Sequence, residues 1–157
     1  MQAPRIYLDT SVFSGCFDSA FEAESRKLVD LIVGGRVQLV VGEAVDQEVD
    51  DGPARVRQLF ASIPTRNIER VALDESGLAL ARAYIDWGAL AERSWNDARH
   101  LASATQVRVD AIASWNFRDI VNVRRMRTFN AVNLTLGYGL LVIVSPQGIT
   151  AATEQES

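Results

Sequence analysis

The stretch Arg5-Ile6-Tyr7-Leu8-Asp9-Thr10-Ser11 runs four residues with strand character directly into a carboxylate and two hydroxyls. Residues 5–8 predict a strand that enters a hydrophobic core. Asp9 has two interpretations at this point. It is a good turn residue in an Asp-Thr-Ser sequence, and it is also well placed to bind a ligand at the end of a buried strand. Later parts of the chain supply further acids, and these favour the ligand-binding interpretation.

Composition restricts the class of protein. The 157 residues are enough for about one domain, and a hydrophobic content of 48% is enough for a core. No apolar run approaches the roughly 18 residues of a membrane span, and the N-terminus lacks the apolar segment of a signal peptide, so we expect a cytoplasmic protein with no membrane partner. The single Cys16 excludes an internal disulfide, and the single His100 excludes a multi-histidine metal site.

The net charge of −4 does not indicate a basic nucleic-acid-binding protein. This argument is weak for a protein that collects carboxylates around a divalent cation, because such a protein contacts phosphate through the bound ion.

Short apolar runs predict strands over residues 5–8, 37–41, 110–114 and 140–144, and the run over 37–41 is rich in β-branched residues. Residues 67–73 fit either a short strand or an extended linker. Helical periodicity predicts helices over residues 21–33, 43–51, 54–62, 74–87 and 121–136, and a further helix that begins at Ser94. Gly34-Gly35 is expected to end the first of these helices.

The order of strands and helices predicts an α/β fold with three α/β/α layers. Its sheet is expected to be mostly parallel, with four to five strands and helices on both faces. No repeat or linker divides the chain, so residues 1–150 are expected to form a single domain. The small and polar residues 151–157 are predicted to be a disordered tail.

Acidic and amide residues follow the predicted strands. In open α/β sheets, ligands bind beyond the carboxyl ends of parallel strands. The residues expected near that edge are Asp9, Glu43, Asp46, Glu48, Asp97, Asn116 and Asp119. Converging carboxylates repel one another unless a cation compensates their charge, and Mg²⁺ and Mn²⁺ prefer oxygen ligands. The cluster therefore predicts metal-dependent hydrolysis of phosphodiester bonds.

Four motifs in order resemble those of PIN-domain proteins, over the chain from Ile6 to about Pro146. They are Tyr7-Leu8-Asp9-Thr10-Ser11, an acid on the helix after the second strand, Asn96 to Ala104, and Ala113-Ser114-Trp115-Asn116-Phe117. Most small members of this family are VapC-type ribonuclease toxins, each neutralised by a cognate antitoxin, and the Trp-Asn-Phe sequence resembles one subgroup. The resemblance implies a Mg²⁺- or Mn²⁺-dependent endoribonuclease that acts on RNA, forms a homodimer and binds an antitoxin.

The resemblance also implies roles for individual residues. Asp9, Glu48 and Asp97 match the family's three acids, and Glu48 is preferred to Glu43 because the family's glutamate lies inside the helix. The fourth position of the family pattern, where many members have Asp, is Asn116 in this chain. The resemblance therefore implies the catalytic set Asp9, Glu48, Asp97 and Asn116. Because an amide is a poorer metal ligand than a carboxylate, Asp119 is predicted as the fourth metal ligand, beside Asp9, Glu48 and Asp97. The residues predicted to contact substrate are Thr10, Ser11, Arg118 and Arg124.

Structural explanations remain open beside these functional ones. Asp97 is predicted to form a capping box with Ser94, and the helix dipole favours an acid such as Glu48 near a helix N-terminus. His100 is expected to be a packed or hydrogen-bonded histidine rather than a general base. Two hydroxyls are expected to cap the next helix and hydrogen-bond the site: Thr10 and Ser11. Three roles stay open for the one basic cluster: contact with RNA phosphates, contact with an antitoxin, or a solvated helix face. The cluster consists of Arg118, Arg124, Arg125 and Arg127.

Three other functions are compatible with the sequence. The neutral Asn116 permits a non-catalytic interaction module that keeps the fold with a weakened metal site. A stand-alone RNA-processing nuclease is the alternative to a toxin. An aspartyl phosphatase of the haloacid-dehalogenase type is disfavoured, because that pattern requires a second Asp where Ser11 stands.

Overall fold

A five-stranded parallel sheet forms the centre of the protein. The computed structural model describes residues 2–155, and its strands lie in the order β3-β2-β1-β4-β5 with every neighbouring pair parallel. The strands are β1 (Arg5–Leu8), β2 (Gln38–Gly42), β3 (Ile68–Val71), β4 (Ala111–Ala113) and β5 (Ile143–Val144). The helices are α1 (Thr10–Gly15), α2 (Glu22–Val33), α3 (Glu43–Asp50), α4 (Ala54–Ala61), α5 (Glu75–Asp86), α6 (Trp95–Gln106), α7 (Val123–Thr135) and α8 (Pro146–Gln155).

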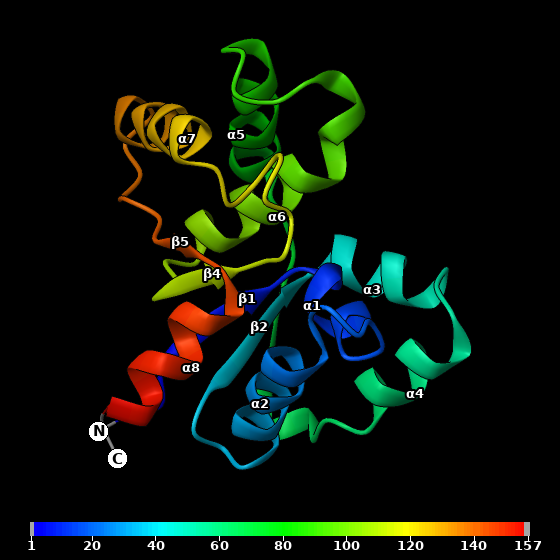
Figure 1. Cartoon of the computed structure of the whole chain (residues 1–157). Helices are drawn as coiled ribbons and strands as arrows, with labels where there is room; N and C mark the ends of the chain where they lie inside the picture. Colours follow the sequence, from blue (N-terminus) through cyan, green and yellow to red (C-terminus); the bar gives the residue numbers. More distant parts are fainter. Residues whose placement is uncertain (1, 156–157) are drawn as a thin grey trace.

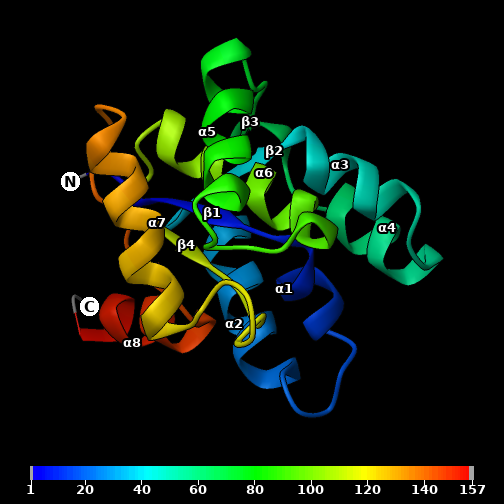
Figure 2. The same ribbon diagram turned by 90° about the horizontal axis from the view of Figure 1, so that it is seen from above.

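Helices cover both faces of this sheet. Helices α2 and α8 pack together on one face, and α5, α6 and α7 lie on the other (Figure 1). Helices α1, α3 and α4 lie beside one another near the carboxyl ends of β1 and β2, as the view from above also shows (Figure 2). The three-layer α/β/α fold and the parallel sheet of the sequence prediction are confirmed.

The hydrophobic pattern explains why the predicted strands form. Residues 39–41 of β2 are all buried, as expected for a parallel strand that has helices on both faces. Helix α6 buries Ala98, Leu101, Ala102 and Ala104. Helix α2 ends at Gly34, and the next residue, Gly35, has a φ of 77° that suits a residue without a side chain.

Three local predictions need correction or completion. Helix α1 was not predicted as a separate element, because it has only six residues. Residues 67–73 contain strand β3 rather than a linker. The predicted strand over residues 140–144 shortens to Ile143–Val144, and Leu140 is 69% exposed.

The predicted disordered tail is wrong for residues 151–155, which continue helix α8. This helix is held by contacts that are distant in sequence, because it packs against α2 and against β4 and β5. The Thr150 hydroxyl donates a hydrogen bond to Glu24 on α2 at 2.7 Å. The rest of that prediction, residues 156–157, lies outside the described residues. Within residues 2–155, no helix is both long and apolar enough to cross a membrane.

Candidate active site at the carboxyl edge of the sheet

The register of β1 and β4 brings the first acid against a serine. Leu8 pairs with Ala113, so Asp9 and Ser114 are the next residues on two adjacent parallel strands. The Ser114 hydroxyl donates to Asp9 Oδ2 at 2.7 Å, and the Ser11 hydroxyl donates to Oδ1 at 2.5 Å. Ser11 also accepts the backbone N–H of Trp115 at 3.0 Å, which ties α1 to the loop after β4.

Asp9 is nearly inaccessible to solvent, with 4% of its surface exposed. Burial raises the pKa of its carboxyl group, although the electrostatic interaction with His100 and the hydrogen bonds from the two serine hydroxyls oppose that rise. Asp9 occupies the N-cap position of α1, but its side chain makes no capping hydrogen bond. Thr10 and Ser11 lie inside α1, and neither α1 nor α2 has a side-chain capping bond, so the prediction that they cap the next helix is wrong. Their predicted hydrogen bonds to the site are present.

Glu48 reaches the same edge from α3. Its Oε1 atom lies 2.6 Å from His100 Nε2, and it accepts a hydrogen bond from the Thr10 hydroxyl at 3.1 Å. Burial raises the pKa of Glu48, but the hydrogen bond and charge of His100, the Thr10 hydroxyl and the charge of Arg99 outweigh burial, so the pKa lies below its usual value. Glu48 therefore stays ionised, which a metal-binding carboxylate requires.

Asp97 comes from the first turn of α6. Ser94 is the N-cap residue of this helix, but its hydroxyl makes no capping hydrogen bond, so the predicted capping box does not form. The Asp97 carboxylate instead accepts a hydrogen bond from Asn116 Nδ2 at 3.4 Å. Burial first, and then the negative charges of Asp9, Asp119 and Glu48, raise the pKa of Asp97 to about 6 despite the opposing effect of His100.

Asn116 and Asp119 both belong to the site, in different ways. The Asn116 side chain bridges its neighbours, because its Oδ1 atom also accepts the backbone N–H of Asp119 at 3.0 Å. Asp119 is buried and lies beside two guanidinium groups, 3.4 Å from Arg118 Nε and 3.6 Å from Arg125 Nη2. The arginines partly offset the charge of Asp119, yet this charge raises the pKa of Asp97 more than the charge of Glu48 does. Asn116 and Asp119 therefore both lie close to Asp97.

These acids suit a hard divalent cation in their chemistry. Three carboxylates from separate elements, Asp9, Glu48 and Asp97, are close enough to influence one another's pKa values. Their negative charges are opposed by His100 and, at Glu48, by Arg99. Among residues 2–155, no three His, Cys, Asp or Glu side chains lie in positions that could hold a metal ion as they stand. The donor set still fits Mg²⁺ or Mn²⁺, because it consists of oxygen ligands whose mutual repulsion a cation relieves.

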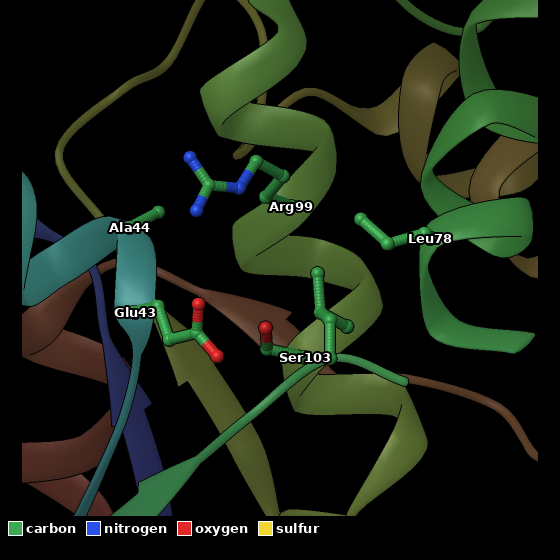
Figure 3. Close-up of a pocket in the computed structure, with 6 residues that line it drawn as sticks. Glu43, Ala44, Leu78, Arg99 and Ser103 are labelled. Carbon is green, nitrogen blue, oxygen red and sulfur yellow. The ribbon is translucent and has the colours of Figure 1, made fainter. Parts of the chain in front are cut away.

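Glu43, the rejected candidate for the second acid, lies elsewhere. It lines a small pocket of about 80 Å³ together with Arg99 and Ser103. Figure 3 shows its carboxylate turned towards Ser103. This pocket is not lined by Asp9, Glu48 or Asp97. The side chain on α3 that joins the other acids is therefore Glu48.

Sequence reasoning missed two residues of the site, Tyr7 and Ser114. Ser114 follows β4 as Asp9 follows β1, and this equivalent position after adjacent parallel strands was the signal that it would meet Asp9. Tyr7 lies on β1 two residues before Asp9, which follows the strand with an extended backbone, so both side chains are expected on one face of the sheet. Its hydroxyl lies 2.7 Å from His100 Nδ1, a contact that the sequence did not indicate.

We expect Ser114→Ala to lower the free energy of unfolding by about 1–3 kcal/mol at pH 7, because it removes a buried hydrogen bond to a charged group. The loss is expected to shrink at low pH, where Asp9 is protonated and needs the donor less. Urea denaturation across pH measures both effects. Ser103→Ala, at another buried serine, is the control, and the interpretation fails if both variants show the same pH trend.

No model of a known protein family matches this chain, and a search of curated proteins finds no relative. The resemblance to PIN-domain proteins therefore stays a prediction, and the functional argument rests on the arrangement of the acids.

Proposed function

We propose that this protein is a Mg²⁺- or Mn²⁺-dependent endoribonuclease of the PIN type, and that it acts in the cytoplasm as the toxin of a toxin–antitoxin pair. The observation that carries this proposal is the convergence of Asp9, Glu48 and Asp97 from β1, α3 and α6 at the carboxyl edge of one parallel sheet. Ligands bind at this edge in open α/β sheets.

Each acid contributes differently to such a site. Glu48 remains ionised because His100 and Thr10 donate to it. Asp9 is rigidly held by two hydroxyls, and Asp97 is held by the Asn116 amide. A bound Mg²⁺ or Mn²⁺ supplies an acidified water and offsets charge that develops on the phosphodiester. The protein's part is to hold the three carboxylates in place and to exclude bulk water from Asp9.

Arginines beside the site support an RNA substrate. Arg118 is largely exposed next to Asp119, with 70% of its side chain accessible. Arg124 and Arg125 line a polar hollow of about 320 Å³ with Asn122 and Thr128. Guanidinium groups bind phosphate well, so this surface suits the RNA backbone on either side of the cleaved bond. An antitoxin that blocks cleavage is expected to compete for the same charges.

One observation favours a second function, a non-catalytic interaction module of the same fold. Asp9, Glu48 and Asp97 each accept hydrogen bonds from other side chains of the protein, so their charges are partly accommodated without a cation. The two functions differ in metal affinity. A protein that fails to bind Mn²⁺ at millimolar concentration favours the interaction module.

The proposed activity predicts that purified protein cleaves RNA in the presence of Mn²⁺ or Mg²⁺ and that EDTA abolishes cleavage. Because a cation binds the native state, saturating Mn²⁺ is expected to add about 2.7 kcal/mol to the free energy of unfolding at 100 times its dissociation constant. Gel assays with labelled RNA and thermal denaturation with and without Mn²⁺ test both results. Cleavage that persists in EDTA contradicts a metal-dependent mechanism.

The toxin role needs a separate test. A small adjacent open reading frame is expected to encode a protein that binds this chain and suppresses cleavage. Co-expression followed by co-purification and the RNA assay measures this directly. A nuclease without such a neighbour is a stand-alone RNA-processing enzyme.

A further inference from the structure

A buried chain of hydrogen bonds leads from the sheet to the Glu48 carboxylate. The backbone N–H of Gly42, at the end of β2, donates to the Tyr7 hydroxyl oxygen at 3.2 Å. That hydroxyl lies 2.7 Å from His100 Nδ1, and His100 Nε2 lies 2.6 Å from Glu48 Oε1. Four elements, β2, β1, α6 and α3, are thereby joined in one line.

The direction of this chain follows from its last bond. The ionised Glu48 carboxylate can only accept, so the hydrogen on His100 Nε2 is donated to Glu48. In the neutral imidazole, Nδ1 then accepts from the Tyr7 hydroxyl, whose oxygen accepts from the Gly42 N–H. The hydrogen-bond partner of one ring nitrogen thus determines whether the other nitrogen donates or accepts, as is common for histidines around metal sites.

The chain is closed to solvent up to its last member. Tyr7 is 0% exposed and His100 is 2% exposed. Gly42 permits the close approach, because a Cβ atom at this position would lie 3.0 Å from the Tyr7 hydroxyl and 2.8 Å from Ser103 Oγ. A side chain at residue 42 would displace the Tyr7 hydroxyl or Ser103, so glycine preserves the contact that begins the chain.

The hydrogen-bond chain ends at the half-buried carboxylate of Glu48, which faces the other acids. His100 and Thr10 both donate to Oε1 of Glu48, and neither bond uses Oε2. The carboxylate is thereby held with one oxygen anchored and the other open to a ligand. This arrangement differs from that of Tyr84, an equally buried tyrosine whose hydroxyl ends on Thr105 and Asn133, both neutral.

We propose that Tyr7 and His100 are positioning residues that orient Glu48 for metal binding, with Tyr7 acting through His100 and His100 acting directly on the carboxylate. This inference rests on the proposed function, since it assigns a role in the same metal site. It assigns no contact with RNA or with the reacting atoms to either residue. His100, which the sequence predicted to be packed or hydrogen-bonded rather than a general base, is thus proposed to orient Glu48.

Tyr7→Phe tests the proposal, because it removes only the hydroxyl and keeps the edge-to-face ring contact with His100. Loss of a residue that supports a metal ligand typically weakens metal affinity by about 10–100-fold, and we expect about tenfold for this indirect contact. Calorimetric titration with Mn²⁺ alone, without RNA, measures the affinity. Tyr84→Phe is the matched control, expected to lose similar thermal stability and to bind Mn²⁺ as the wild type does.

Two His100 variants separate positioning from packing. His100→Gln keeps an N–H that can donate to Glu48, whereas His100→Phe keeps a ring and removes both nitrogens. Mn²⁺ affinity is expected to be largely retained in His100→Gln and lost in His100→Phe. Circular dichroism confirms that each variant is folded before titration.

A double-mutant cycle with Glu48→Gln shows whether the effect passes through that carboxylate. Tyr7→Phe is expected to reduce Mn²⁺ affinity in the wild-type background and to have no further effect when Glu48 is already Gln. An equal reduction in both backgrounds overturns the proposal. Unchanged affinity in Tyr7→Phe also overturns it while leaving the nuclease proposal intact, whereas a wild type that does not bind Mn²⁺ overturns both.

Discussion

Asp9→Asn is expected to reduce metal-dependent RNA cleavage by about a thousandfold or more, equivalent to roughly 4 kcal/mol of transition-state stabilisation. The reason is its position as the most buried of the three acids, at the end of the central strand β1. Asn is nearly the same size and keeps an oxygen that can accept from Ser11 or Ser114. Initial rates with labelled RNA under saturating Mn²⁺ measure the loss.

The same variant is expected to be at least as stable as the wild type at pH 7. Burial raises the pKa of Asp9 above its ordinary value of 3.8. The stability that its protonated form contributes is therefore fully present below about pH 4 and is lost as the pH rises through the raised pKa. Above the raised pKa the wild type carries the cost of an ionised buried group, and Asn removes that cost.

Asp46→Asn is the control for Asp9→Asn, because Asp46 lies on α3 and forms a surface ion pair with Arg70 of β3. It is expected to leave cleavage unchanged. An Asp9→Asn protein that still cleaves RNA at the wild-type rate contradicts the role of Asp9 as a ligand. A loss of activity accompanied by a large loss of stability shows instead that the change has damaged the fold.

Asp97→Asn is expected to weaken Mn²⁺ binding and cleavage by about a hundredfold, because it replaces a charged ligand by a neutral amide beside a second amide, Asn116. In the wild type, Mn²⁺ affinity is expected to rise as the pH increases through about 6, the pKa of Asp97, since a carboxylate ligand must be deprotonated. Calorimetry between pH 5 and about pH 7 follows this change.

Stability changes in the opposite direction over this range. The pKa of Asp97 is raised from 3.8 to about 6, so the stability contributed by its protonated form is present below about pH 4 and is lost as the pH rises through about 6. Because Asp97 is partly exposed, solvent screening reduces this effect to on the order of 1 kcal/mol. The difference between wild-type and Asp97→Asn unfolding free energies is expected to shift by this amount between pH 4 and about pH 6.

Asp86→Asn controls for the loss of a carboxylate outside the site, because Asp86 pairs with Arg82 on the surface of α5. Its unfolding free energy is expected to follow the wild type across the same pH range. An Asp97→Asn protein with the wild-type pH profile contradicts the electrostatic coupling of Asp97 to the other acids.

The local sequence pattern was sufficient for four of the five strands and for the acids expected at their carboxyl ends. Short apolar runs predict β1, β2 and β4, and alternation with helices makes them parallel. Parallel strands share a carboxyl edge, so Asp9 and Glu48 could be expected near one another before any coordinates were known. The choice of Glu48 over Glu43 followed from the family resemblance, and Glu43 lines a pocket (Figure 3) to which none of the other acids contributes.

Contacts between distant segments decided the rest, because hydrogen bonding depends on strand register and on the rotation of each helix about its axis. The Ser94–Asp97 pair has the spacing of a capping box, yet Asp97 accepts from Asn116, a partner 19 residues away. Helix α8 forms because it packs on α2 and the sheet, although its own residues are small and polar.

The stretch from Arg5 to Ser11 illustrates the division between sequence and tertiary structure. Its pattern was enough to predict a buried strand that ends on an acid, since alternation and hydrophobicity are local properties. The hydroxyls that hold Asp9, and the link from Tyr7 through His100 to Glu48, arise only when β1 lies between β2 and β4 and beneath α6. The tertiary structure decides these contacts, because each bond requires two segments to meet within about 3 Å.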